Sequence, residues 1–158
     1  MTKEKNLDND KKSLSPINKI DSDKSFRVKM AEHNLSFPPV DDMTPNLLNM
    51  ALCFTSCKWG QGECGHQLME NLLVTFSESL VKPKYFIFMD SAIYLATQNT
   101  PVQSVDFLKK IEQSGAKVLL NHSSVTQYGQ MSSIEVGEVV KFMEITDIML
   151  SVERFTNF

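Results

Sequence analysis

From residue 47 onward, the apolar residues gather in short runs that are separated by polar and glycine-rich segments. The run LLNMALCF is almost continuously apolar, and the runs KYFIFMD and AKVLLN have the same character. Short continuous apolar runs are typical of strands that are buried on both faces of a parallel sheet. We therefore expect a buried strand at each of these runs, and a last short strand at ERFTNF.

Between these runs, apolar residues recur at the spacing of one helical face. The first predicted helix follows the glycine-rich stretch and ends before Lys82-Pro83, and the second ends at Gly115. A third helix is predicted near the C-terminus, whereas SAIYLATQNTP predicts a loop with a helical turn and HSSVTQYGQ a polar loop. The three apolar faces are expected to be Leu68, Leu72, Leu73, Phe76 and Leu80; Val105, Leu108 and Ile111; and Val139, Phe142, Ile145, Met149 and Val152.

Strands and helices thus alternate along about 110 residues, which predicts an α/β sandwich with a mainly parallel sheet. In such sheets, ligands bind at the carboxyl ends of the strands. This rule brings together three segments that are distant in the sequence: residues 55–65, 90–100 and 121–130.

The first 45 residues differ from the rest of the chain. They contain eight basic and eight acidic residues, no glycine, and only two aromatic residues, Phe26 and Phe37. Such a segment cannot bury enough apolar surface to offset the entropy lost on ordering. We therefore predict a disordered polar tail over residues 1–46 and a folded domain over residues 47–158.

Overall composition excludes several classes of function. The 158 residues carry a formal net charge of −3, so no large basic field is present to recruit nucleic acid or an anionic membrane. The N-terminus has no apolar core of a secretory signal, and no run approaches the length of a membrane span. With only three clustered cysteines, no secreted disulfide framework is expected. These features predict a cytoplasmic protein whose thiols are reduced.

All three cysteines lie in the stretch CFTSCKWGQGECGH, residues 53–66, which has several interpretations. GQGECG matches the G-x-G-x-x-G fingerprint of dinucleotide sites, with Asp90 as the acidic partner. However, five residues separate the strand from Gly60, and Asp90 comes later than the fingerprint requires. A metal site at Cys57, Cys64 and His66 would lack the paired short spacings of structural zinc sites, so none is predicted.

Two further interpretations concern the thiols themselves. Cys64 is expected in the first helical turn, where the helix dipole favours a thiolate, and Cys57 lies beside Lys58. Alternatively, the glycines only turn the chain and the cysteines only pack, as we expect for Cys53 within its strand. Trp59, in a polar loop, is expected either to line a ligand rim or an oligomer interface or to pack locally.

Residues 47–158 resemble the DsrE-like domain of the YedF proteins, a sulfurtransferase-like family of selenium metabolism. The resemblance rests on three segments: SCKWGQGECGHQLMENLL, YFIFMDSAIYLATQNTPVQSVDFLKKIEQSGAKVLL and SSIEVGEVVKFMEITDIML. It implies a three-layer α/β sandwich with a mainly parallel sheet of about five strands. It also implies a homo-oligomer that handles sulfur or selenium as a persulfide or related species on cysteine, without a bound cofactor.

The chain departs from this family in two places. Residues 1–46 contain no cysteine and therefore no Cys-Pro-x-Pro motif, so a separate TusA-like sulfur carrier would be the partner that supplies it. Asn121 and Ser124 stand where the family has cysteines in a Cys-Gly-x-Cys loop. A serine nucleophile at Ser124 would need an aligned base, and adjacent His122 is poorly placed for this.

Two functions remain open from the sequence. Thiol transfer has moved to Cys57 or Cys64, or the domain is a non-catalytic module that binds a small anion or a protein. Dinucleotide binding is a third alternative. The residues expected to line the ligand site are Ser56, Trp59, Gly60, Gly62, Asp90, Asn121, Ser123 and Ser124.

Overall fold

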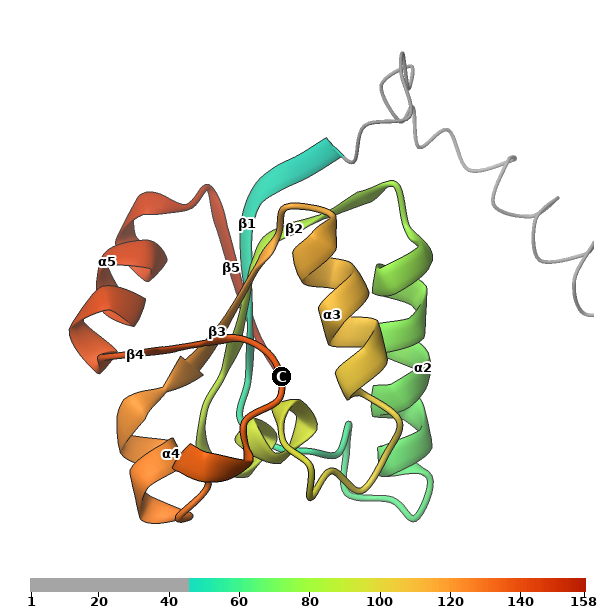
Figure 1. The fold of residues 1–158 in the computed structure, drawn as a ribbon. Helices are drawn as coiled ribbons and strands as arrows, with labels where there is room; N and C mark the ends of the chain where they lie inside the picture. Colours follow the sequence, from blue (N-terminus) through green and yellow to red (C-terminus); the bar gives the residue numbers. More distant parts are fainter. Residues whose placement is uncertain (1–45) are drawn as a thin grey trace, which may run out of the picture. The chain divides into compact units, whose positions relative to one another are not determined.

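The computed structural model describes residues 46–158, which form one five-stranded parallel sheet with helices on both faces (Figure 1). The strand order is β4-β3-β2-β1-β5, and each of the four neighbouring pairs is parallel. The predicted α/β fold is therefore confirmed, whereas the predicted tail lies outside the described residues except for Asn46. The elements are β1 (Asn46–Phe54), α2 (Gly65–Glu78), β2 (Val81–Phe88), η1 (Asp90–Ala96), α3 (Val105–Gln113), β3 (Lys117–Asn121), α4 (His122–Gln127), η2 (Met131–Ser133), β4 (Glu138–Val140), α5 (Phe142–Ser151) and β5 (Arg154–Asn157).

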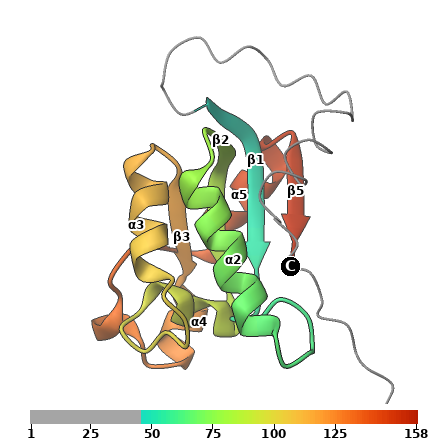
Figure 2. The same ribbon diagram turned by 90° about the vertical axis from the view of Figure 1, so that its right-hand side faces the viewer.

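The two faces of the sheet are covered by different helices. Helices α2 and α3 lie side by side on one face, and α5 lies alone on the other (Figures 1 and 2). Side chains alternate between the faces along a strand. Phe54, Phe86 and Phe88 therefore point toward α2 and α3, while Cys53 and Ile87 point toward α5.

Two predicted elements have a different structure. The polar segment that follows β3 is not a loop but begins with helix α4, because the Asn121 side chain caps it. Val139 does not belong to the last helix, because it lies in the short edge strand β4 and α5 starts only at Phe142.

The predicted buried face of α2 is also partly wrong. Met69 and Leu73 are the large side chains of α2 that are fully buried, whereas Leu68 is 42% exposed. Leu80 is likewise exposed, because α2 ends at Glu78 and Leu80 belongs to the turn into β2. Leu72 and Phe76 pack against the core at its margin, as predicted.

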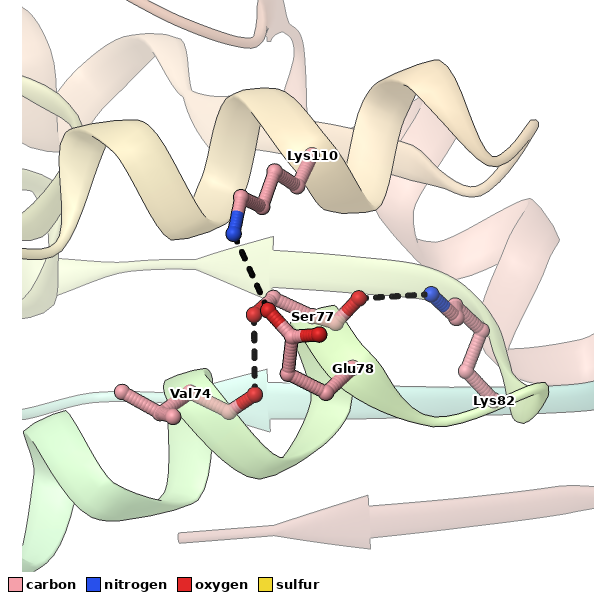
Figure 3. A network of polar contacts seen from close by, with 5 residues as sticks. All are labelled: Val74, Ser77, Glu78, Lys82 and Lys110. Carbon is pink, nitrogen blue, oxygen red and sulfur yellow. Dashed lines mark hydrogen bonds and ion pairs between the residues drawn. The ribbon is translucent and has the colours of Figure 1, made fainter.

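A polar network joins α2, α3 and the start of β2, near the amino ends of the strands (Figure 3). The ammonium group of Lys110 lies 2.9 Å from a carboxylate oxygen of Glu78. The Lys82 ammonium donates to the carbonyl of Ser77 at 3.4 Å, and the Ser77 hydroxyl donates to the carbonyl of Val74 at 2.8 Å. Burial lowers the pKa of Lys82, and the nearby Glu78 carboxylate partly opposes this effect.

Candidate functional site

The carboxyl ends of β1, β2 and β3 meet at one rim of the sheet, where α4 and η1 also lie (Figure 1). Asp90, just beyond β2, adopts a φ of +48°, which makes it the one non-glycine residue among residues 46–158 with a positive φ. Aspartate tolerates this left-handed conformation better than most residues, but it still costs free energy. Backbone strain of this kind concentrates at functional sites.

A chain of hydrogen bonds connects β2 to α4 across this rim. The backbone N–H of Asp90 donates to Ser124 Oγ at 2.9 Å, and the Ser124 hydroxyl donates to Asn121 Oδ1 at 3.1 Å. On the other side of Asp90, the hydroxyl of Tyr128 donates to Asp90 Oδ1. Three of the predicted site residues, Asp90, Asn121 and Ser124, are therefore brought together.

Asn121 has a structural role that explains its identity. Its Oδ1 atom accepts hydrogen bonds from both the backbone N–H and the hydroxyl of Ser124, which caps the N-terminus of α4. Asparagine is among the best N-cap residues. Within residues 46–158, its Nδ2 atom is the one buried side-chain nitrogen or oxygen without a hydrogen-bond partner. The positions where the resemblance places cysteines are thus used to hold α4 against β2.

Tyr128 belongs to this network although it is not among the site residues predicted from the sequence. The hydrogen bond to Asp90 is the main cause that raises its pKa, followed by burial and by the charges of Asp90, Tyr94 and Cys57. Its ring packs edge-on against Tyr94, with 5.5 Å between the centroids. In the sequence, the one sign of this role is an aromatic residue within the otherwise polar segment HSSVTQYGQ.

The three cysteines are free and differ in exposure. Cys53 is buried under α5, as predicted, and burial raises the pKa of its thiol from 9.0 to about 11. Cys57 is half-buried in the first rim loop and lies close enough for its charge to raise the pKa of Tyr128. Cys64 is exposed and immediately precedes α2, rather than lying in its first turn.

The glycines of GQGECG serve the packing of their own loop. Gly60 has a φ of +82°, and a Cβ atom on Gly65 would lie 3.1 Å from the carbonyl oxygen of Gly60. The backbone N–H of Trp59 also donates to the Gly65 carbonyl at 2.9 Å. In a dinucleotide site, the third glycine allows the helix to pack closely against the strand. Here the third glycine, Gly65, lies against the backbone of its own loop instead.

The remaining predicted residues are more peripheral. Trp59 packs edge-on against Phe158, with 5.6 Å between ring centroids, and Ser56 Oγ accepts a hydrogen bond from the backbone of Lys58 at 3.1 Å. Ser123 is exposed on α4, and Gly62 is exposed in the first loop. These side chains do not join the network around Asp90.

His66 contacts the first loop. Its Nδ1 atom lies 3.2 Å from the carbonyl oxygen of Cys57, which ties the start of α2 to that loop. Across the described part of the chain, no three histidine, cysteine, aspartate or glutamate side chains are arranged to hold a metal ion. In the same residues, no helix is long and apolar enough to cross a membrane.

Comparisons with known proteins support the fold only. No protein-family model matches the chain, and no curated protein matches it. The crystal structure of the YchN protein from E. coli is similar, with a TM-score of 0.50 and 12% sequence identity. The match covers 72% of this chain and 99% of that one. It supports a DsrE-like fold for the described residues.

Proposed function

We propose that this chain is a sulfur- or selenium-handling protein of DsrE-like fold that carries the transferred atom on Cys57. The observation that carries the proposal is the position of this half-buried thiol in the loop that directly follows the carboxyl end of β1. Its charge is also among the causes that raise the pKa of Tyr128, the hydrogen-bond partner of Asp90. Cys64 is exposed directly before α2, and Cys53 is buried under α5. Cys57 is thus the thiol best placed to meet a small ligand at the carboxyl ends.

The proposed step is a sulfur transfer between thiols. The Cys57 thiolate attacks the outer sulfur of a donor persulfide, an S–S bond forms to Cys57, and the S–S bond of the donor breaks. The donor leaves as a thiolate, so no external oxidant or reductant is needed. The thiolate is the reactive form, and free thiols persist in a reducing compartment such as the cytoplasm. The donor in this proposal is a TusA-like carrier or a small persulfide.

A second candidate function is a non-catalytic module that binds a small anion or a protein. The observation in its favour is that Asn121 and Ser124 cap α4 and hold Asp90, at the positions where the resemblance places cysteines. Under this alternative, the rim keeps its shape but the thiols carry no sulfur.

Peptide mass spectrometry after exposure to glutathione persulfide distinguishes the two. We would purify the full chain without reductant and map the added sulfur. The expected adduct lies on Cys57, is lost in Cys57→Ser and is retained in the matched variant Cys64→Ser. An adduct that stays on Cys64 in Cys57→Ser overturns the assignment to Cys57. The absence of any adduct overturns sulfur transfer in favour of the binding module.

A further inference from the structure

Phe158, the residue that follows β5, contacts the first rim loop at two places. Its carbonyl oxygen accepts hydrogen bonds from the backbone N–H and the hydroxyl of Thr55, at 3.1 and 2.9 Å. Its ring packs edge-on against Trp59, with 5.6 Å between centroids and 83° between the planes. Cys57 lies midway between Thr55 and Trp59 in the sequence. A single residue beyond β5 therefore holds both ends of the short segment that carries Cys57.

Phe158 is itself fixed to the core of the sheet. Its backbone N–H donates to the carbonyl of Cys53 in β1 at 2.8 Å. Its ring stacks on Phe54, with 5.3 Å between centroids, and Phe54 stacks in turn on Phe88 at 5.2 Å. Phe54 and Phe88 are fully buried. These contacts extend the aromatic core out to Trp59, which is 41% exposed.

The start of α2 also holds the segment. The carbonyl oxygen of Cys57 lies 3.2 Å from Nδ1 of His66, and the backbone N–H of Trp59 donates to the carbonyl of Gly65. The half-buried Cys57 side chain packs at the margin of the core under α2 and α3. A single torsion separates the backbone of a cysteine from its sulfur, so a fixed backbone leaves that sulfur only a few staggered positions.

We propose that Phe158 is a positioning residue for Cys57. It acts through Thr55 and Trp59, which it ties to the aromatic core, so that the thiol stays at the carboxyl ends of the strands. The inference rests on the proposed function for the role of Cys57 in sulfur transfer, but the anchoring is measurable without that chemistry. We call Thr55, Trp59 and Phe158 the Phe158 anchor.

Release of the Phe158 anchor should have two opposite effects on Cys57. Alkylation by a small reagent requires little more than an exposed thiol, so it should become faster when the segment leaves the core. Sulfur transfer requires the thiol at a set position relative to the donor, and a displacement of about 1 Å lowers such a rate by up to about a hundredfold. A residue that only supports the fold would not change these two rates in opposite directions.

Alkylation of the full chain by iodoacetamide tests the anchor, with peptide mass spectrometry that localises the label. Phe158→Leu stays apolar but removes the ring that contacts Trp59. Labelling of Cys57 should become about two- to tenfold faster, the range expected when a local opening loses an edge-on aromatic contact. Buried Cys53 should keep its rate, because the sheet stays closed. Equal rates at Cys57 in this variant and in wild type overturn the proposal.

Two matched variants assign the effect to the ring of Phe158. Phe158→Tyr keeps an aromatic ring and should label Cys57 at the wild-type rate. Phe155 also belongs to β5 but packs on the face under α5, so Phe155→Leu should leave the rate unchanged as well. If Phe155→Leu speeds the labelling of Cys57 as much as Phe158→Leu does, the effect comes from β5 in general, and the assignment to Phe158 is overturned.

Trp59→Leu tests the same contact from its exposed side, so the fold should tolerate it even if Phe158→Leu does not fold. Labelling of Cys57 should become faster, as in Phe158→Leu, while the rate at Cys53 stays unchanged. If labelling of Cys53 and Cys57 rises in equal measure, the variant has lost stability throughout the domain, and the proposal is overturned.

Sulfur uptake from glutathione persulfide tests the positioning itself. In Phe158→Leu, the rate of uptake by Cys57 should fall several-fold while its alkylation becomes faster. If uptake rises together with alkylation, Phe158 only shields the thiol, and the positioning role is overturned. If wild type takes up no sulfur at all, the proposed function fails, and the alkylation rates alone decide whether Phe158 anchors Cys57.

Discussion

The two faces of the sheet are built from the same strands but bury side chains of different size. The face under α2 and α3 contains Phe54, Phe86 and Phe88, and the face under α5 contains the smaller side chains Ala51, Cys53 and Ile87 at the alternating positions. Two helices and η1 cover the first face, and a single helix covers the second. A strand that is apolar throughout can therefore support a deep core on one side and a thin layer on the other.

We call the face under α2 and α3 the deep face and the face under α5 the thin face. The largest loss of stability is expected from a substitution on the deep face. Phe86→Ala removes a fully buried ring that packs edge-on against Phe76, with 5.4 Å between centroids. Loss of a buried aromatic ring leaves a cavity that the neighbours fill only in part, and it typically lowers the free energy of unfolding by about 3–5 kcal/mol. Urea denaturation at neutral pH measures this change. A loss below about 1 kcal/mol would show that the deep face is not the main core.

A matched pair of isoleucines compares the two faces directly. Ile111 on α3 and Ile145 on α5 are both fully buried helical residues, but they lie on opposite faces of the sheet. Ile111→Ala should cost about 3–4 kcal/mol, and Ile145→Ala closer to 2 kcal/mol, because the thin layer can relax into the cavity. Urea midpoints of the two variants give the difference. Equal losses would contradict the distinction between a deep and a thin face.

A smaller effect should appear at high pH through Cys53. Burial raises the pKa of this thiol from 9.0 to about 11, so the folded chain keeps the proton that the unfolded chain releases. The contribution is fully present below pH 9 and is lost as pH rises toward about 11. The destabilisation of Cys53→Ala relative to wild type should therefore shrink by about 1 kcal/mol between pH 8 and pH 10.

The measurement is the free energy of unfolding of both proteins at these two pH values. Cys64→Ala, which removes an exposed cysteine, serves as the control and should parallel wild type. A destabilisation by Cys53→Ala that is independent of pH would contradict the burial of this thiol.

The smallest effect is expected on the outer side of α5. Leu150→Gln should change the free energy of unfolding by less than about 0.5 kcal/mol, because the side chain is 82% exposed and glutamine is a good helix former. Urea denaturation at neutral pH measures this change. A loss above about 1 kcal/mol would mean that Leu150 supports the fold.

The central strands could be predicted because apolar runs mark strands regardless of which face is deeper. The runs LLNMALCF, KYFIFMD and AKVLLN lie in or overlap β1, β2 and β3, and ERFTNF contains β5. Helix α4 could not be predicted in this way, because its segment is polar and a cap from Asn121 starts it. Strand β4 was assigned to a helix, because three edge residues carry too short a pattern to separate it from α5.

The candidate site was predictable only in part. The rule for parallel sheets placed Asp90, Asn121 and Ser124 at one rim, and hydrogen bonds join them there. The role of Tyr128 depends on the turn after α4 and on the left-handed backbone of Asp90. Neither feature leaves a periodic pattern, so the sequence alone could not join these two residues.

The position of β1 has a consequence for how the chain folds. Strand β1 pairs with β2 on one side and with β5 on the other, where Met50 lies opposite Arg154. That pairing closes a loop of about a hundred residues, and such distant contacts slow folding toward milliseconds to seconds. Until β5 pairs with it, this edge of β1 exposes unpaired backbone N–H and C=O groups, which can pair with a strand of another chain. Refolding should therefore be concentration-sensitive, with aggregation competing against the last step of sheet assembly.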